Sequence, residues 1–219
     1  MRTMVTTRDR IIVATNEVFR RKGYNGASLS QISEASGVTI GSIYHFFPAG
    51  KEALGVAVIE TTGTVYGELF ESIAAAASDP ASAYRDMFVG AAFVLEDTDF
   101  IDPCPIGTIA REVANTSEPL RAAASDAFRS WIQAARNHLE AAGVPPDRAE
   151  ELATVFVATM EGCFVLSRSM RNTSPMFAAG RCLAGLVEQA VADAARDRPT
   201  RASRKDAGTG PLAPTRGRS

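Results

Sequence analysis

The sequence predicts an all-α protein of about nine helices, with a small N-terminal domain followed by a larger C-terminal one. Apolar residues recur at helical spacing along almost the whole chain, and no run alternates with the period of two that marks a β-strand. Capping residues, glycines and prolines separate these runs at the distances expected of helix ends. With 219 residues, 46% of them hydrophobic, the chain is long enough to bury one substantial core and a smaller one.

The N-terminal domain is predicted over residues 6–66 and opens with a helix that runs to about Lys22. Thr6 or Thr7 caps its first turn, and Gly23 closes it because glycine accepts the backbone angles that end a helix. Its inward face carries Ile11, Ile12, Ala14, Val18 and Phe19.

Two short helices joined by a glycine follow within residues 27–54. Ser28 caps the first helix and forms a capping box with Gln31. Gly37 supplies the turn, Thr39 caps the second helix, and Pro48 ends it. The expected buried stripe of the second helix is Ile40, Ile43, Phe46 and Phe47. The pattern predicts a helix-turn-helix, although such helix pairs also occur in proteins that do not bind DNA.

The outward-facing residues of this segment are small or form hydrogen bonds, which suits a helix lying in a DNA groove. Base-edge contacts are expected from Thr39, Gly41, Ser42 and His45, and phosphate contacts from Ser28, Tyr44 and Lys51. The predicted partner is therefore double-stranded DNA.

The larger domain is predicted over residues 67–195, and about six helices follow the first three. The first of the six begins near Gly50, crosses the domain boundary and reaches about Ala77. The others are expected at about 80–95, 105–113, 118–142, 146–169 and 175–195. Residues 196–219 are rich in Arg, Pro, Gly, Ser and Thr and predict a disordered basic tail.

Charge is distributed unevenly along the chain although the net charge is only −2. Residues 1–51 hold seven Lys or Arg and three acids, and residues 196–219 hold seven Lys or Arg and two acids. The region between them holds most of the acidic residues. The basic ends are thus suited to binding a polyanion, whereas the acidic middle would be repelled by one.

Targeting and membrane signals are not predicted, so we expect a cytoplasmic protein. The N-terminus lacks the apolar core of a signal peptide, and no run of about 18 apolar residues predicts a membrane span. The three cysteines, Cys104, Cys163 and Cys182, form an odd and widely spaced set typical of reduced thiols.

Residues 9–56 closely resemble the DNA-binding domain of the TetR/AcrR family of transcriptional regulators. Phe47–Lys51 holds one residue more than the commonest form of the family, and Cys104–Gly107 is a second distinctive segment. Both features are similar to the LmrA/YxaF-type branch. The matching positions include Gly23-Tyr24, Ser28-Leu29, Ile32, Ala35–Val38, Gly41–Tyr44, Phe46-Phe47 and Lys51–Leu54.

The resemblance implies a homodimeric repressor that a small, hydrophobic effector releases from a pseudo-palindromic operator. Dimerisation is expected through the last two helices, about 146–169 and 175–195, which are apolar around much of their circumference and rich in small residues. An internal helix covering the same surface is the alternative. The effector pocket is predicted to be lined by Phe88, Phe93, Thr108, Arg111, Glu112, Trp131, Gln133, Met160 and Phe164.

Two further classes of function are weighed against this reading. No catalytic residue, metal site or cofactor is predicted, because the chain has only two histidines and no phosphate loop. His138 is expected at a solvated surface position. The second class is a redox-sensing regulator that uses Cys104 or Cys163, since a thiol near a helix N-terminus can become a reactive thiolate.

Overall fold

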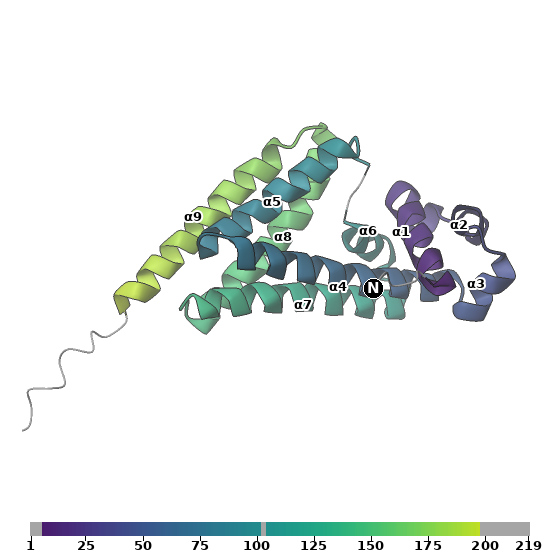
Figure 1. Ribbon diagram of the computed structural model, residues 1–219, viewed down its shortest axis with the longest axis horizontal. Coiled ribbons are helices and arrows are strands. Elements are labelled where there is room, and N and C mark those ends of the chain that lie inside the picture. Colours follow the sequence, from purple (N-terminus) through teal and green to yellow (C-terminus); the bar gives the residue numbers. More distant parts are fainter. Residues whose placement is uncertain (1–5, 102–103, 198–219) are drawn as a thin grey trace, which may run out of the picture.

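The computed structural model describes residues 6–101 and 104–197, which form nine α-helices and no strand (Figure 1). The all-α prediction is therefore confirmed. The N-terminal four helices are α1 (Thr7–Gly26), α2 (Leu29–Ser36), α3 (Ile40–Phe46) and α4 (Lys51–Ala76). The remaining five are α5 (Pro80–Asp97), α6 (Pro105–Val113), α7 (Glu118–Ala141), α8 (Pro146–Met170) and α9 (Ser174–Asp197).

Helix boundaries follow the capping residues that the sequence contains. Thr6 forms a capping box with Asp9 at the start of α1, and Ser28 forms one with Gln31 at the start of α2. Gly37 ends α2 in the left-handed region at φ 67°, where a side chain would be strained. Gly23 also has a positive φ, of 73°, but it kinks α1 where the sequence predicted an end, and one more turn reaches Gly26.

Two hydrophobic cores are present in the described residues. The first joins α1–α3 and the start of α4 to α6 and the first half of α7, and the second is built from α5, α7, α8 and α9 with the end of α4. The predicted domain boundary at 66/67 falls inside α4, which runs unbroken between the two cores. The long helices α4 and α7 lie side by side and connect the two ends of the molecule (Figure 1).

His138 is half-buried, whereas the sequence predicted a solvated surface position. Its ring packs edge-on against Phe70 at 5.8 Å between centroids and lies 5.7 Å from the ring of Tyr84. Its Nδ1 atom is buried without a hydrogen-bond partner. These aromatic contacts come from α4 and α5, and the helical pattern of α7 alone does not reveal them.

Parts of two sequence predictions lie outside the described residues. These are residues 102–103, in the connection between the helices expected at about 80–95 and 105–113, and the basic tail from 198 onward. Within the described residues, no helix combines the length and the hydropathy needed to cross a bilayer.

Candidate functional site

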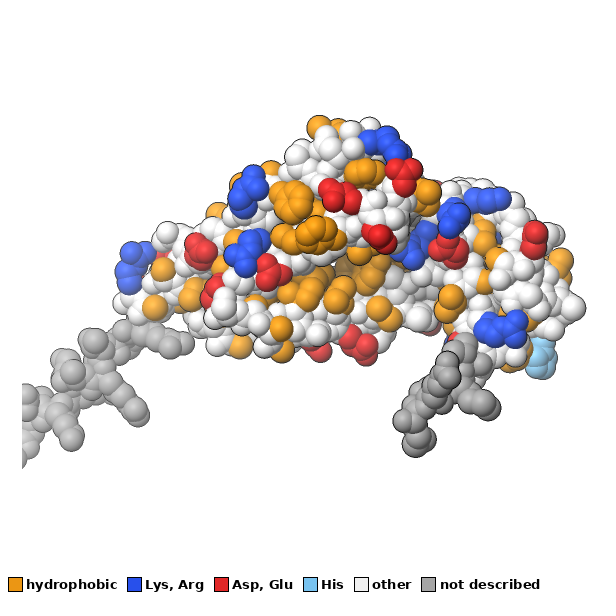
Figure 2. All heavy atoms as spheres, turned by 45° about the horizontal axis from the view of Figure 1, so that its top comes forward, with side chains coloured by type: hydrophobic (Ala, Val, Ile, Leu, Met, Phe, Trp, Pro, Cys, Tyr) orange, Lys and Arg blue, Asp and Glu red, His pale blue; other side chains and the backbone are white. Residues whose placement is uncertain are grey.

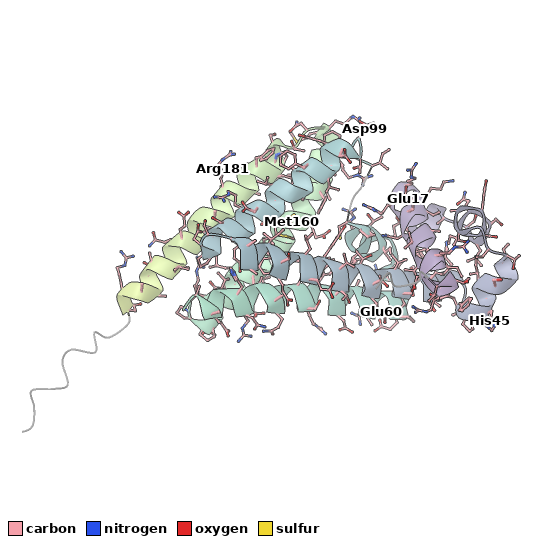
Figure 3. The ribbon with its side chains drawn as sticks, viewed as in Figure 1. Glu17, His45, Glu60, Asp99, Met160 and Arg181 are labelled. Carbon is pink, nitrogen blue, oxygen red and sulfur yellow. The ribbon has the colours of Figure 1, made fainter. Side chains whose placement is uncertain are left out.

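The helix-turn-helix is formed by α2, the turn at Gly37 and α3. Ile32, Ile43 and Phe47 are buried and hold the pair against α1. Thr39, Gly41, Tyr44 and His45 are exposed along the outer side of α3, and Ser42 is half-buried. Figure 3 shows His45 at the tip of the molecule, pointing away from the other helices.

Two members of the predicted buried stripe of α3 are exposed. Ile40 and Phe46 retain 40% and 39% of their accessible surface, whereas Ile43 and Phe47 are enclosed. A helix of seven residues turns only one narrow face to α1 and α2, so the flanking positions stay open. The outer surface of α3 is consequently more apolar than the sequence predicted.

Hydrogen bonds hold the start of α3 in place. The backbone N–H of Ser42 donates to the Thr39 hydroxyl at 3.2 Å, and the two hydroxyl oxygens are 3.1 Å apart. Ser28 likewise accepts from the backbone N–H of Gln31 at 3.3 Å. The caps hold these hydroxyls in place, with Ser28 and Thr39 exposed and Ser42 half-buried.

Lys51 makes contacts within the protein that the sequence did not reveal. Its ammonium donates to the carbonyl oxygens of Tyr24 and Ala27, each at 3.1 Å, and lies 4.5 Å from the centroid of the Tyr24 ring. An ammonium carries three donors, so one N–H remains for a phosphate. Lys51 therefore ties the end of α1 to the start of α4, and the phosphate contact stays a prediction.

Two arginines of α1 also belong to this surface, although sequence analysis did not single them out. Arg10 donates from Nη2 to the carbonyl of Ser36 at 2.7 Å and so contacts the C-terminal end of α2. The guanidinium of Arg8 lies 5.3 Å from the centroid of the Phe47 ring. Both are long-range contacts, and the sequence pattern of α1 carries no signal for them.

A cavity of about 300 Å³ lies in the C-terminal part, between α4, α5, α7 and α8. Three of the residues expected to line an effector pocket line this cavity, namely Trp131, Met160 and Phe164. Figure 3 shows Met160 in the space between α4 and α5, and apolar side chains gather in the middle of the face in Figure 2. The other apolar lining includes Tyr66, Leu69, Phe70, Ile73, Met87, Ala91, Val94, Ala134, Phe156 and Val157.

The remaining six predicted pocket residues do not line this cavity. Phe88 is fully enclosed in the second core, whereas Phe93 is 61% exposed at the surface. Gln133 is exposed and donates to Asn137 on its own helix. The others are on α6, where Arg111 is exposed and the hydroxyl of Thr108 is buried without a partner.

Glu112, the last of these six, connects the two parts of the molecule. Its carboxylate accepts a hydrogen bond from the backbone N–H of Asn25 at 2.7 Å, and it occupies the space that a side chain at Gly23 would need. Glu112 thus holds the end of α6 against the kink of α1.

The cysteines differ in accessibility, and Cys182 is the exposed one of the three. Cys104 is buried, and burial, with the charge of Glu161, raises the pKa of its thiol. Burial also raises the pKa of Cys163. Both thiols stay protonated at neutral pH, so neither has the thiolate character of a redox sensor.

Comparison with known proteins places both parts of the chain in one group. Residues 11–58 match the model for bacterial regulatory proteins of the tetR family, and residues 80–182 match the C-terminal domain of LmrA/YxaF-like transcriptional regulators. The transcriptional regulator LmrA of Bacillus subtilis is 30% identical over 84% of this chain and 97% of its own length. The chain belongs to the TetR family.

Further relatives agree with this assignment. The uncharacterised regulator YxaF of Bacillus subtilis is 32% identical over 78% of this chain and 89% of its own length. A cysteine mutant of the TetR-family regulator CifR, complexed with 26-base-pair operator DNA, shares the fold with a TM-score of 0.69 at 21% identity, covering 81% of this chain and 95% of CifR. The protein is accordingly a DNA-binding transcriptional regulator and not an enzyme.

Proposed function

We propose that this TetR-family protein is a homodimeric repressor that a small, largely hydrophobic effector releases from a pseudo-palindromic operator. The exposed outer side of α3 reads the major groove, with Thr39, Gly41, Ser42 and His45 at base edges. Ser28, Tyr44 and Lys51 contact phosphates. The single observation that supports this most is the capped, outward-facing α3 at the tip of the molecule.

The dimer is proposed to form through one face of α8 and α9. Along α8 a stripe of apolar and small residues is exposed, and Val155, Val165, Leu166 and Met170 keep between 43% and 57% of their surface. Gly162 on α8 and Gly185 on α9 have open space above them, which lets a second pair of helices approach closely. A two-fold axis here places two copies of α3 on successive turns of the duplex.

The release mechanism follows from what α6 contacts. Cys104, at the start of α6, lines the cavity, and Glu112, near its end, holds α1. An effector that fits the cavity better in one arrangement of α6 shifts the population toward that arrangement, because only differential affinity moves the equilibrium. Such an effector lowers the protein's affinity for DNA without contacting the DNA itself.

Selection of duplexes from a random pool by the purified full-length protein tests the reading of DNA. We expect a sequence with two-fold symmetry and half-sites about one helical turn apart. His45→Ala and Thr39→Ala should each weaken the selected site by about 1–3 kcal/mol per lost base contact. Gln133→Ala, exposed on α7, is the control that should not change affinity. The proposal would be contradicted if the selected sites lacked two-fold symmetry, or if the α3 variants bound the selected site as tightly as the unchanged protein does.

A further inference from the structure

The cavity is apolar apart from one ionisable carboxyl group. Glu161, on α8, is its acidic residue, among lining side chains that are otherwise aromatic, aliphatic or glycine, with the Cys104 thiol and the Tyr66 hydroxyl as additional polar atoms. A carboxyl group inside an apolar cavity is costly unless a partner satisfies it. Its presence there calls for a physical reason.

The neighbouring start of α6 is shaped around this carboxyl group. The Cys104 sulfur caps α6 by accepting the backbone N–H of Gly107 at 3.4 Å, and Cys104 and Glu161 line the same cavity. A Cβ atom at Gly107 would overlap the Glu161 carboxylate in its present position, so a larger residue there would displace that carboxylate. The Cys104–Gly107 segment, distinctive in the sequence, thus leaves space for the Glu161 carboxylate.

The protein itself provides little compensation for this charge. Arg111 is the cation that acts on Glu161, but it is exposed, and within the described part of the chain it forms no ion pair with Glu161. Burial raises the pKa of the Glu161 carboxyl group. A partner inside the cavity would offset this cost, and the protein leaves about 300 Å³ for it.

We propose that Glu161 anchors the effector, which is a largely apolar molecule that presents a hydrogen-bond donor, an ammonium or a hydroxyl group, and carries no carboxylate. This inference rests on the proposed function, because it specifies the chemical class of the effector of the same regulator. An ionised carboxylate only accepts hydrogen bonds, and it repels an anion. Tyr66, Trp131 and Phe164 around it offer aromatic faces that attract a cation or stack on a ring.

Trp131 provides a direct readout, since it is the single tryptophan of the chain and lines the cavity. Four ligands with the same transparent body separate the chemistries: 1-adamantanemethylamine, 1-adamantanemethanol, 1-adamantanecarboxylic acid and its methyl ester. Titration of the full-length protein should change Trp131 fluorescence at lower concentrations of the amine and the alcohol than of the acid and the ester. If the amine binds more tightly than the alcohol, the effector is cationic. If the two bind with equal affinity, the effector presents a neutral hydrogen-bond donor.

Glu161→Gln removes the charge at nearly constant volume. The substitution should weaken binding of the amine by on the order of tenfold or more, as expected for loss of a hydrogen bond to a charged group. The acid and the amine should then bind with similar affinities. Glu151→Gln, exposed on the same helix, is the matched control and should bind all four ligands like the parent protein.

The proposal is overturned if the acid or the ester binds the parent protein as well as the two donors do, if none of the four binds, or if Glu161→Gln keeps the parent's preference. The titrations of the unchanged protein with the four ligands test the proposal even if Glu161→Gln does not fold. Binding to the selected operator, measured without ligand, distinguishes the failures. If the protein binds the operator but does not prefer the amine and the alcohol over the acid and the ester, Glu161 does not anchor the effector. The proposed DNA-binding function would then still stand.

Discussion

Glu112 on α6 accepts a hydrogen bond from the backbone N–H of Asn25 at the end of α1, at 2.7 Å, across 87 residues of sequence. This contact joins α6, whose N-cap residue Cys104 lines the cavity, to α1, which packs against the helix-turn-helix. Gly23 makes it feasible, because any side chain there would occupy the place of the carboxylate.

Glu112→Ala should weaken the attachment of α6 to α1. Loss of one hydrogen bond to a half-buried carboxylate predicts a decrease of about 1–2 kcal/mol in the free energy of unfolding, and faster exchange of the Asn25 amide hydrogen. Denaturant unfolding and hydrogen exchange by NMR measure the two effects. Glu118→Ala, which removes an exposed ion pair with Arg121, should change stability much less. An unchanged Asn25 exchange rate would show that the contact does not hold the helices together.

Lys51→Ala should have two separate effects. Losing the bonds to the Tyr24 and Ala27 carbonyls lowers the melting temperature, and losing a phosphate contact reduces the slope of log affinity against log salt by about 0.9. Thermal unfolding and DNA titrations at several salt concentrations measure these effects. Lys22→Ala, exposed on α1, should leave the melting temperature unchanged. A lower melting temperature with an unchanged salt slope would restrict Lys51 to a structural role.

Leu166→Glu should disrupt the proposed dimer. A charge in the exposed apolar stripe of α8 would be buried without a partner between two subunits, so the variant should dissociate at concentrations where the parent is dimeric. Analytical ultracentrifugation measures the change. Val13→Glu introduces the same charge at a residue of α1 that is 66% exposed, and it should remain dimeric. A dimeric Leu166→Glu protein would place the interface elsewhere.

Acidification should destabilise the protein through His138. Burial lowers the pKa of His138, so the native state keeps it neutral while the unfolded chain takes up a proton near pH 6.5. The free energy of unfolding should therefore decrease as the pH falls from above 6.5 toward the lower native pKa. His138→Phe should flatten this dependence, and His45→Gln, at an exposed site, should not. Urea unfolding from pH 7.5 to 5.5 measures the difference.

Thiol reagents should leave Cys104 and Cys163 untouched in the folded protein, because both are buried. A maleimide should therefore label Cys182→Ser only after denaturation, which mass spectrometry detects. DNA binding by the Cys182→Ser protein should be the same before and after treatment with an oxidant. Loss of binding on oxidation of this variant would restore the redox-sensing alternative.

Local sequence signals predicted the helices well, because caps and turns act over a few residues. Thr6, Ser28 and Thr39 start helices in the structure as their side chains predicted, and Gly37 provides the turn. Gly23 was the exception. It kinks α1 and does not end it, since α1 regains helical geometry after one residue.

Side-chain environments were predicted less well, because they depend on distant segments. Of the residues that helical spacing selected for an effector pocket, Trp131, Met160 and Phe164 line the cavity, whereas Phe88 lies in the core and Phe93 faces solvent. The sequence of α7 does not indicate that the rings of Phe70 and Tyr84 pack against His138.

The sequence by itself determined the all-helical class, the helix-turn-helix and the membership of the TetR family, because these depend on short-range periodicity and an ordered motif. Only the tertiary structure decided which groups meet across the chain. It brought Lys51 to the carbonyls of α1, Glu112 to Asn25, and Glu161 to the start of α6. Such contacts arise from the packing of helices far apart in sequence, and no local pattern encodes the distance between them.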